Sequence, residues 1–422
     1  MGTKPWLSLA ALLFVANQIN GWYIFSYKNG LYKGHAEVLN DVDLGGLSLN
    51  LSGIDEVHFS APNFSTLTLE MQSWLINVEK FCLQSVNVST VHVDAHFVYF
   101  LIEGGPTSTV VIDPSSNYET EQFRVSRGQL NELPKNLLAM KKLKMMDFKN
   151  NQIEIVNMED FSGLKFLEEI CLSQNRIKEM SAFPVVLPGL ERFDISNNQL
   201  KVLNIASWEA SRLKLLSFEK NQLETVNMSH FNRFPNLETI NLARNRIIEI
   251  SSDPVELPEL TEFDVSFNRL NEISFEHWNT SSVKQVRIAV NRLTTAHGLP
   301  KVFPALQQVS LVSNPFNCDW LDTTQDELKS RNVEIQESSM VTCDKSVTLL
   351  EDFKKIVKEL QSQVELLKPS SNQNGPTPSG AENQKQFERQ IWRMEQKLES
   401  FDKMSSSIAR ILLGGVNRKN VN

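Results

Sequence analysis

Three polar residues at alternate positions of the chain carry groups that could hold a metal ion. His92, Asp94 and His96 offer two imidazoles and a carboxylate, which are common ligands of zinc. In an extended chain every second side chain points to the same side, so the three would share one face of a strand. The same spacing arises wherever polar residues line the solvent side of a strand, and we favour that interpretation. We therefore expect neither a metal nor another cofactor here.

Other groupings of reactive side chains are sparse. Acidic residues recur at Asp147, Asp194 and Asp264, and a closely held pair of carboxylates could perform general acid–base catalysis. The sequence has no Gly-x-Ser-x-Gly turn for a nucleophilic serine and no Gly-rich loop of the phosphate-binding type. We therefore expect no enzyme, and we expect the acidic residues to belong to a polar surface.

A repeat marked by asparagine positions these residues. Asparagine returns every 23 or 24 residues in the frame apolar-x-x-apolar-x-apolar-x-x-Asn-x-apolar, for example in the segment 190–200. This period and internal spacing are the signature of a leucine-rich-repeat solenoid, which stacks its repeats around one continuous core. The eight asparagines are Asn151, Asn175, Asn198, Asn221, Asn245, Asn268, Asn291 and Asn314.

Within each repeat, the apolar-x-apolar triplet predicts a short strand whose alternate side chains point into the core. Successive strands would form a parallel sheet on the concave side of an α/β horseshoe. The repeat asparagine would satisfy buried backbone groups at the turn after each strand, which is a structural role. The middle residue of the triplet faces outward, and the candidate partner-binding residues on the concave face are Asp147, Asp194, Asn241, Asp264 and Arg287.

The frame continues in weaker form toward the N-terminus. Gly128 takes the asparagine slot after Phe123 and Val125, and earlier strands are predicted around 57–59, 81–83 and 100–102. Eight regular and about four degenerate repeats would fill residues 54–316. The convex segments around Pro188 and Pro258 predict turns or short 3₁₀ pieces rather than full helices.

Arginine follows the repeat asparagine directly at Arg176, Arg246, Arg269 and Arg292. These residues are expected to form a ladder along one edge of the concave sheet. One interpretation is a solvated edge that interleaves with glutamates of the next turn. The other is a basic rim beside the acidic column, a charge pattern that would orient a partner more than it adds affinity.

The four cysteines divide into two kinds. Cys318 follows the last repeat in the segment Asn-Pro-Phe-Asn-Cys, and Cys343 comes 25 residues later. We predict a disulfide between them that closes a C-terminal cap, residues 317–345, and stabilises it by ~3 kcal/mol. Residues 22–53 would cap the other end. Cys82 and Cys171 occupy outward strand positions several repeats apart, too far to bridge each other. They are inert thiols, or one of them links to another chain, or they bind a metal.

The N-terminal segment and the acceptor sites indicate an extracellular protein. Residues 1–21 read as a secretory signal peptide, with Lys4 before an apolar run that is too short to span a bilayer. No other segment reaches membrane-spanning length, and the net charge of −8 argues against a nucleic-acid partner. Five Asn-x-Ser/Thr glycosylation acceptors agree with secretion: Asn50, Asn63, Asn87, Asn227 and Asn279.

After the cap the periodicity becomes helical. A helix is predicted at 349–368, a flexible linker at 369–383, and a second helix at 384–413 with four heptads of coiled-coil pattern. The candidate association residues are Ile391, Trp392, Leu398 and Phe401. Either the helices form a hairpin packed on themselves or on the solenoid, or they pair with a second chain as a homo- or heterodimer.

The repeat frame resembles the leucine-rich-repeat family of extracellular recognition proteins. The wider plan of signal peptide, solenoid, Asn-Pro-Phe-Asn-Cys cap and coiled-coil helices resembles the mosquito leucine-rich-repeat immune proteins of haemolymph. The resemblance implies dimers that stabilise and deliver complement-like thioester proteins, in company with a paralogous leucine-rich-repeat chain. No cysteine follows Cys343, so a covalent link between chains would have to come from Cys82 or Cys171.

Three functions follow from these observations. The first is a secreted recognition or scaffold protein of innate immunity that binds protein partners through the concave face. The second is an extracellular-matrix or adhesion protein on the same fold, and expression after infection would separate it from the first. The third is an enzyme, which the sequence disfavours because it offers no catalytic constellation.

Overall fold

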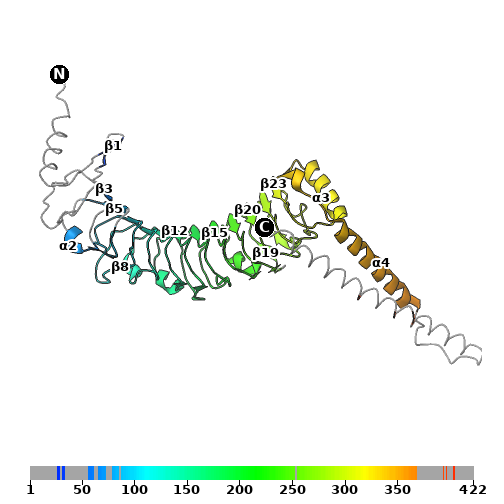
Figure 1. Ribbon diagram of the computed structural model, residues 1–422, viewed down its shortest axis with the longest axis horizontal. Coiled ribbons are helices and arrows are strands. Elements are labelled where there is room, and N and C mark those ends of the chain that lie inside the picture. Colours follow the sequence, from blue (N-terminus) through cyan, green and yellow to red (C-terminus); the bar gives the residue numbers. More distant parts are fainter. Residues whose placement is uncertain are drawn as a thin grey trace, which may run out of the picture.

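The computed structural model describes residues 26–28, 31–33, 56–60, 65–72, 78–84, 87–251 and 254–367, and the single positions 393, 396 and 403. Strands stack one after another along a curved rod, and helices follow at its C-terminal end (Figure 1). No helix among these residues is both long enough and apolar enough to cross a membrane. The predicted segments 1–21 and 369–383 lie outside the described residues, as does nearly all of 384–413.

A parallel sheet of 13 strands forms one side of the rod, and its strands are neighbours in chain order. This is the leucine-rich-repeat solenoid that the sequence predicts, including its four degenerate repeats. The strands are β3 (Glu56–Ser60), β5 (Lys80–Gln84), β7 (Tyr99–Glu103), β9 (Gln122–Ser126), β10 (Met145–Asp147), β12 (Glu169–Cys171), β14 (Arg192–Asp194), β15 (Leu215–Ser217), β17 (Thr239–Asn241), β20 (Glu262–Asp264), β22 (Gln285–Arg287), β23 (Gln308–Ser310) and β24 (Glu334–Ile335).

The core lies directly behind this sheet. Each three-residue strand places its middle residue inward, and these residues stack in register, as Phe193 does on Leu216 and Leu216 on Ile240. All three are fully buried. Aromatic rings join successive repeats, with the centroids of Phe100 and Phe123 6.0 Å apart. Apolar burial of this kind is what drives stacking, because a single repeat has too little apolar surface for a core of its own.

The repeat asparagines form a ladder of hydrogen bonds beside the stacked core residues. The Asn198 side-chain nitrogen donates to the carbonyl oxygens of Leu172 and Ile195, both at 3.0 Å, and its oxygen accepts the amide of Ile177 at 2.9 Å. Each bond set links neighbouring repeats, so the predicted structural role is confirmed. Gly128 keeps the slot open at the N-terminal end of the ladder. A Cβ there would lie 2.8 Å from the side-chain oxygen of Asn151.

The convex side consists of turns and 3₁₀ pieces, as predicted, and of short strands that the sequence did not predict. Residues around Pro188 and Pro258 are turns, and α2 is a single helical turn. The elements are β4 (Thr66–Leu67), α2 (Leu69–Gln72), β6 (Thr90–His92), β8 (Thr109–Val111), η3 (Leu137–Ala139), β11 (Ile155–Val156), η4 (Met158–Phe161), β13 (Glu179–Met180), β16 (Thr225–Val226), η5 (Met228–Arg233), β18 (Glu249–Ile250), β19 (Val255–Glu256) and β21 (Trp278–Asn279). Before the solenoid, β1 (Ser26–Lys28) and β2 (Leu31–Lys33) pair antiparallel.

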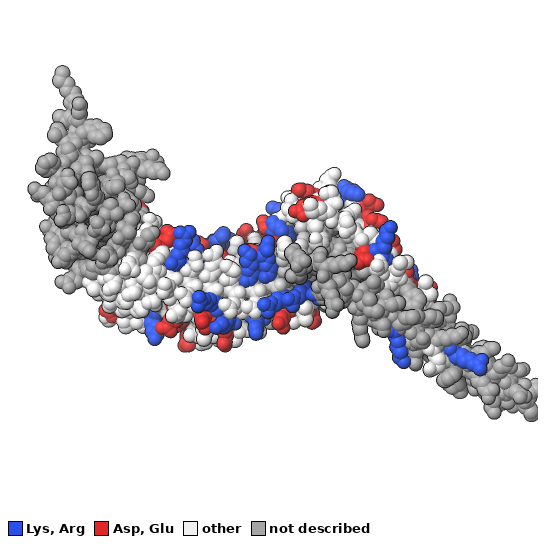
Figure 2. All heavy atoms as spheres, viewed as in Figure 1, with Lys and Arg blue, Asp and Glu red and all other residues white. Residues whose placement is uncertain are grey.

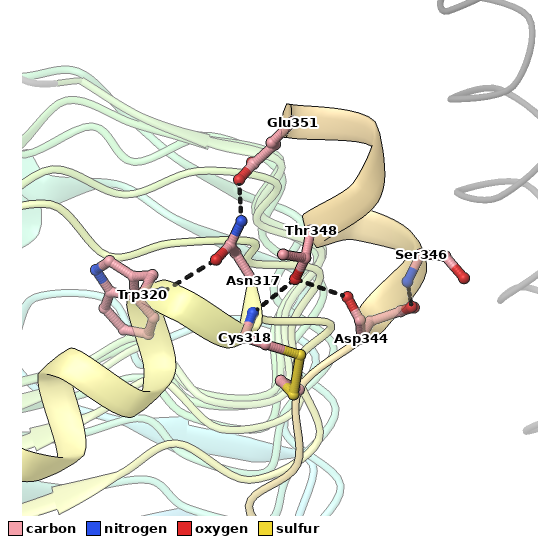
Figure 3. Close-up of a disulfide and its surroundings, with 8 residues drawn as sticks. Asn317, Cys318, Trp320, Asp344, Ser346, Thr348 and Glu351 are labelled. Atoms are coloured by element: carbon pink, nitrogen blue, oxygen red, sulfur yellow. Dashed lines mark hydrogen bonds between the residues drawn. A yellow bond between two sulfur atoms is a disulfide. The ribbon is translucent and has the colours of Figure 1, made fainter. Parts of the chain in front are cut away.

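A helical cap closes the C-terminal end (Figure 3). The predicted disulfide between Cys318 and Cys343 is present, with an S–S distance of 2.11 Å. Helix α3 (Cys318–Ser330) begins at Asn317, whose side chain accepts the Trp320 amide, and strand β24 adds a last rung to the sheet. The turn η6 (Ser338–Met340) then leads to α4 (Lys345–Leu367).

The first turns of α4 belong to the cap. The Cys318 amide donates to the Thr348 hydroxyl at 2.8 Å, and the Asn317 side chain donates to Glu351. Beyond these contacts α4 projects away from the solenoid (Figure 1). The predicted helix at 349–368 therefore corresponds to a helix that starts directly after the disulfide.

Candidate functional site

The outward side chains of the concave sheet form two straight rows. Because the strands are parallel and in register, equivalent residues of successive repeats are direct neighbours. The first row brings together all five residues predicted from the sequence. It runs Asp147, Cys171, Asp194, Ser217, Asn241, Asp264 and Arg287.

The second row lies two residues earlier in each strand, on the same face. It runs Met145, Glu169, Arg192, Leu215, Thr239, Glu262 and Gln285. The two rows together present acidic, basic, polar and aliphatic groups side by side. Figure 2 shows the same mixture of charges along the edges of the solenoid.

Four of the predicted residues also hold the backbone turn that follows their strand. The side-chain oxygens of Asp194 and Asp264 accept the amides of Ser196 and Ser266 at 2.9 and 2.8 Å. Asp147 and Asn241 make the same bond to residues 149 and 243, both at 3.0 Å. One oxygen of each aspartate is thus committed to the fold, which leaves only the second for any other contact. Ser and Asp side chains favour such local turns, so an Asp-x-Ser pair after a strand is a sequence signal for them.

Asp147 is the least available of the five. It is only 7% exposed, and its second oxygen lies 3.4 Å from the Lys149 ammonium. At the other end of the row, the Arg287 guanidinium lies 3.5 Å from Glu262 and 3.7 Å from Asp264. Arg287 therefore offsets the charge of two carboxylates while keeping part of its side chain exposed.

A shallow hollow of about 270 Å³ lies in the middle of the concave face, across strands β12 to β17. Its floor is Ser217, whose small side chain stands between Asp194 and Asn241 in the first row. Larger residues occupy the same position in other strands, Arg124 and Arg287 among them. The hollow is lined by Glu169, Ile170, Cys171, Arg192, Asp194, Ser196, Leu215, Ser217, Glu219, Thr239 and Asn241.

A set of charged residues borders the hollow. The Glu219 carboxylate accepts a hydrogen bond from the Asn241 amide at 3.4 Å and lies 3.5 Å from Arg244 and 3.9 Å from Lys220. On the opposite edge, a hydrogen bond from Lys214 lowers the pKa of Glu191, and Arg212 adds to the effect. Sequence reasoning missed Ser217, Leu215 and Glu219 as lining residues, because the hollow depends on which side chains become register neighbours.

Cys171 lies at the edge of the hollow. Its sulfur is 3.3 Å from the Ser173 hydroxyl and 4.0 Å from an Asp194 oxygen. Burial raises the pKa of the Cys171 thiol, so the reactive thiolate is scarce near neutral pH. The position is half-buried on the concave face, which agrees with the outward position predicted for it.

Cys82 differs from the sequence expectation. It occupies the first row, between His58 and Leu101 in register, but it is only 1% exposed. This burial shows that the outward side of the sheet is not a solvated face at this strand. A link from Cys82 to a second chain would require the protein to open locally, which leaves Cys171 as the more accessible thiol.

The histidine motif also differs from the expected single strand face. Strand β6 ends at His92, and Asp94 and His96 lie in the turn beyond it. The Asp94 carboxylate instead pairs with the His96 ring at 2.8 Å. Within the described part of the chain, no three His, Cys, Asp or Glu side chains gather in a metal-binding arrangement.

The glycosylation acceptors occupy different surroundings. Asn87 and Asn279 are exposed, whereas Asn227 caps η5, with its side-chain oxygen accepting the Ser229 amide at 2.9 Å. Asn50 and Asn63 lie outside the described residues. The association residues Ile391, Trp392, Leu398 and Phe401 lie outside them as well.

The comparisons with known proteins agree with the fold. The leucine-rich-repeat family model matches residues 121–177 and 211–270. No curated protein matches the chain. Two similar solved structures are the leucine-rich repeat domains of APL1B and LRIM1, each 17% identical. They have TM-scores of 0.42 and 0.39, with 79% and 73% of this chain and 93% and 83% of theirs covered.

A third similar structure is a chain of the Drosophila Toll–Spatzle complex. It is 15% identical with a TM-score of 0.49, and the match covers 71% of this chain and 43% of that one. We draw the fold from the repeat geometry and the family model. None of these structural likenesses bears on what the chain binds.

Proposed function

We propose that this chain is a secreted recognition protein of innate immunity that binds a protein partner through the concave sheet. Leucine-rich-repeat solenoids are scaffolds for protein interaction, and their extended concave surface is the usual contact face. The observation that carries the proposal is the pair of side-chain rows centred on the hollow above Ser217. A solvated face with no binding role requires only polar side chains. The mixture of charged and aliphatic groups around a recess therefore favours contact with a partner.

The two rows are long enough to form the centre of a protein interface. Strands β10 to β22 number seven, so at a strand spacing of about 4.8 Å the rows extend for about 29 Å. A typical interface covers about 800 Å² on each partner, so a partner bound on these rows would also contact the turns that flank the strands. The hollow would receive one protruding side chain, and the surrounding charges would set the orientation of the partner.

The identity of the partner is a further part of the proposal. By the family resemblance, it is a complement-like thioester protein, and a paralogous leucine-rich-repeat chain joins the complex. Association would use the heptad helix at 384–413, with Ile391, Leu398 and Phe401 at the seam and Trp392 beside it. Light scattering on the full chain and on a chain ending at Leu367 tests this part. That end point keeps the α4 contacts to the cap, and it should convert a dimer to a monomer.

The concave face is tested by filling its hollow. The substitution Ser217→Arg places in the hollow a side chain that the same sheet position already accommodates at Arg124 and Arg287. The matched control is Thr225→Arg, an exposed residue of β16 on the convex side of the same repeat. Proteins captured from extracellular fluid by the tagged chain are quantified by mass spectrometry.

One or more proteins should be captured by the wild type and by Thr225→Arg, and lost with Ser217→Arg. Capture that survives Ser217→Arg would reject the concave face as the binding site. Capture of matrix components in place of immune proteins would favour the extracellular-matrix function instead.

A further inference from the structure

A second surface lies at the turn that follows each concave strand. The residue before the repeat asparagine, or before Gly128 in the same slot, has a positive φ in nine successive repeats, from Arg127 at 57° to Ser313 at 58°. The reason is a hydrogen bond between repeats. With this backbone conformation, the amide of Phe267 donates to the carbonyl of Ala289, and the amide of Val290 donates to that of Val312. The fold therefore imposes the left-handed conformation at this position whatever residue occupies it.

The residues at this position change character along the solenoid. Asn150 and Asn197 suit a left-handed backbone, because asparagine adopts it with little strain. Phe267 and Val290 do not, and a β-branched or bulky residue there is strained. Folding alone gives no reason to place an aromatic and a β-branched side chain at these two turns. Strain of this kind is commonly retained where a side chain serves binding.

Both residues reach the surface next to arginines. Phe267 is 43% exposed, and the Arg244 guanidinium stacks on its ring at 4.3 Å from the centroid. Arg246 and Arg269 are exposed and follow the asparagines of these repeats. Arg292 holds the same position in the next repeat. Backbone hydrogen bonds align these positions, because the Arg269 amide donates to the Ile247 carbonyl at 2.9 Å and the Arg292 amide donates to the Leu270 carbonyl at 2.8 Å.

Four arginines gather on this edge, although the chain as a whole carries −8. Glu219 is shared between Arg244 and Lys220. Among the ion pairs of the described residues, none involves Arg246 or Arg269, so these two cations are left for another molecule. An apolar ring between guanidinium groups matches a ligand that combines an apolar side chain with carboxylates.

We propose that the turn edge formed by Arg244, Arg246, Phe267, Arg269, Val290 and Arg292 binds an acidic segment of a partner protein that carries an apolar side chain beside its carboxylates. The carboxylates would pair with the arginines, and the apolar side chain would pack on Phe267 and Val290. This surface adjoins the hollow through Arg244 and Glu219 but uses none of the residues of the two rows, and it stands whether or not the concave face binds the partner proposed above.

The test uses a displayed library of random peptides selected against the full chain. Selected peptides should carry Asp or Glu next to an aromatic or aliphatic residue. Their affinity should fall at least tenfold with Phe267→Asn and with Arg269→Gln. The matched control is Arg176→Gln, because Arg176 occupies the same position as Arg269 in an earlier repeat but follows Gln174 instead of an apolar residue. This control should leave the affinity within twofold of the wild type.

Phe267→Asn also separates binding from folding. Asparagine tolerates the left-handed conformation, so this variant should melt at the same temperature as the wild type or higher while it loses the peptide. Selected peptides without the acidic and apolar pattern, or peptides that bind Phe267→Asn as well as the wild type, would overturn the proposal. Heparin binding that is unchanged by Phe267→Asn, with no peptide selected, would overturn it too and would indicate a general polyanion surface.

Discussion

Replacing one asparagine of the ladder tests the physical basis of the solenoid. Asn197 and Asn198 are neighbours with opposite environments. The Asn198 side chain is buried at 8% exposure and bonds to its own repeat and to the preceding one, whereas the Asn197 side chain is exposed. The change Asn198→Ala removes the ladder bonds, and Asn197→Gly keeps the left-handed backbone and removes only an exposed amide. Comparing the two variants therefore separates the effect of the ladder hydrogen bonds from the effect of the turn.

The expected magnitude follows from the bonds that are lost. The buried Ile177 amide loses the Asn198 oxygen that it bonds at 2.9 Å, which costs about 1–3 kcal/mol for an unsatisfied donor. The carbonyls of Leu172 and Ile195 keep a second donor, from Asn175 and Asn221 respectively. Losing one of two donors costs each about 0.5–1 kcal/mol. The free energy of unfolding should thus fall by roughly 2–5 kcal/mol for Asn198→Ala, and by less than about 0.5 kcal/mol for Asn197→Gly.

Two measurements check this expectation. Urea denaturation gives the free energy of unfolding of each variant, and hydrogen exchange reports the Ile177 amide directly. Repeat solenoids often unfold in parts, so the exchange data also show whether the loss is local to the repeats around residue 198. Equal stability of the two variants, with Ile177 still protected in Asn198→Ala, would refute the role assigned to the ladder.

Three further predictions concern single sites. Gly128→Ala should destabilise the chain by about 1–3 kcal/mol in urea denaturation, because its Cβ would crowd the Asn151 side chain, and a neutral result would contradict the crowding. Replacing Cys318 and Cys343 together by serine should cost about 3 kcal/mol and remove the effect of reductant on the melting temperature. Cys171 should react with iodoacetamide more slowly than the freely exposed thiol of glutathione at pH 8, because its raised pKa keeps it protonated. Its rate should rise as the pH approaches that pKa, and reaction as fast as glutathione would disagree with burial of the thiol.

The architecture was predictable because its determinants are periodic. The frame around Phe193, Ile195 and Asn198 states which side chains point inward, and the constant repeat length brings outward residues into one row. Even the degenerate strands at 57–59 and 81–83 follow from the same alternation, since β3 and β5 join the sheet. The disulfide was predictable because Cys318 stands where the repeat ends.

The candidate site was predictable only in outline. The residue types alone do not reveal that Asp194 and Asp264 accept backbone amides of the turns that follow their strands. Only the local geometry shows which carboxylate oxygen remains available. The hollow arises because a serine stands between two larger neighbours from other repeats, which is a property of three strands together. Helix α3 had a local signal, the capping Asn317, which the repeat pattern obscured.

The central claim, that a protein partner is bound on the concave sheet, is tested most directly by a site-specific cross-linker. A photoreactive amino acid at Thr239, which lines the hollow, is compared with the same residue at Thr225 on the convex side. After exposure to extracellular fluid and light, the account predicts a defined cross-linked protein from position 239 and none from position 225. The same product from both positions, or a product from position 225 alone, would contradict it.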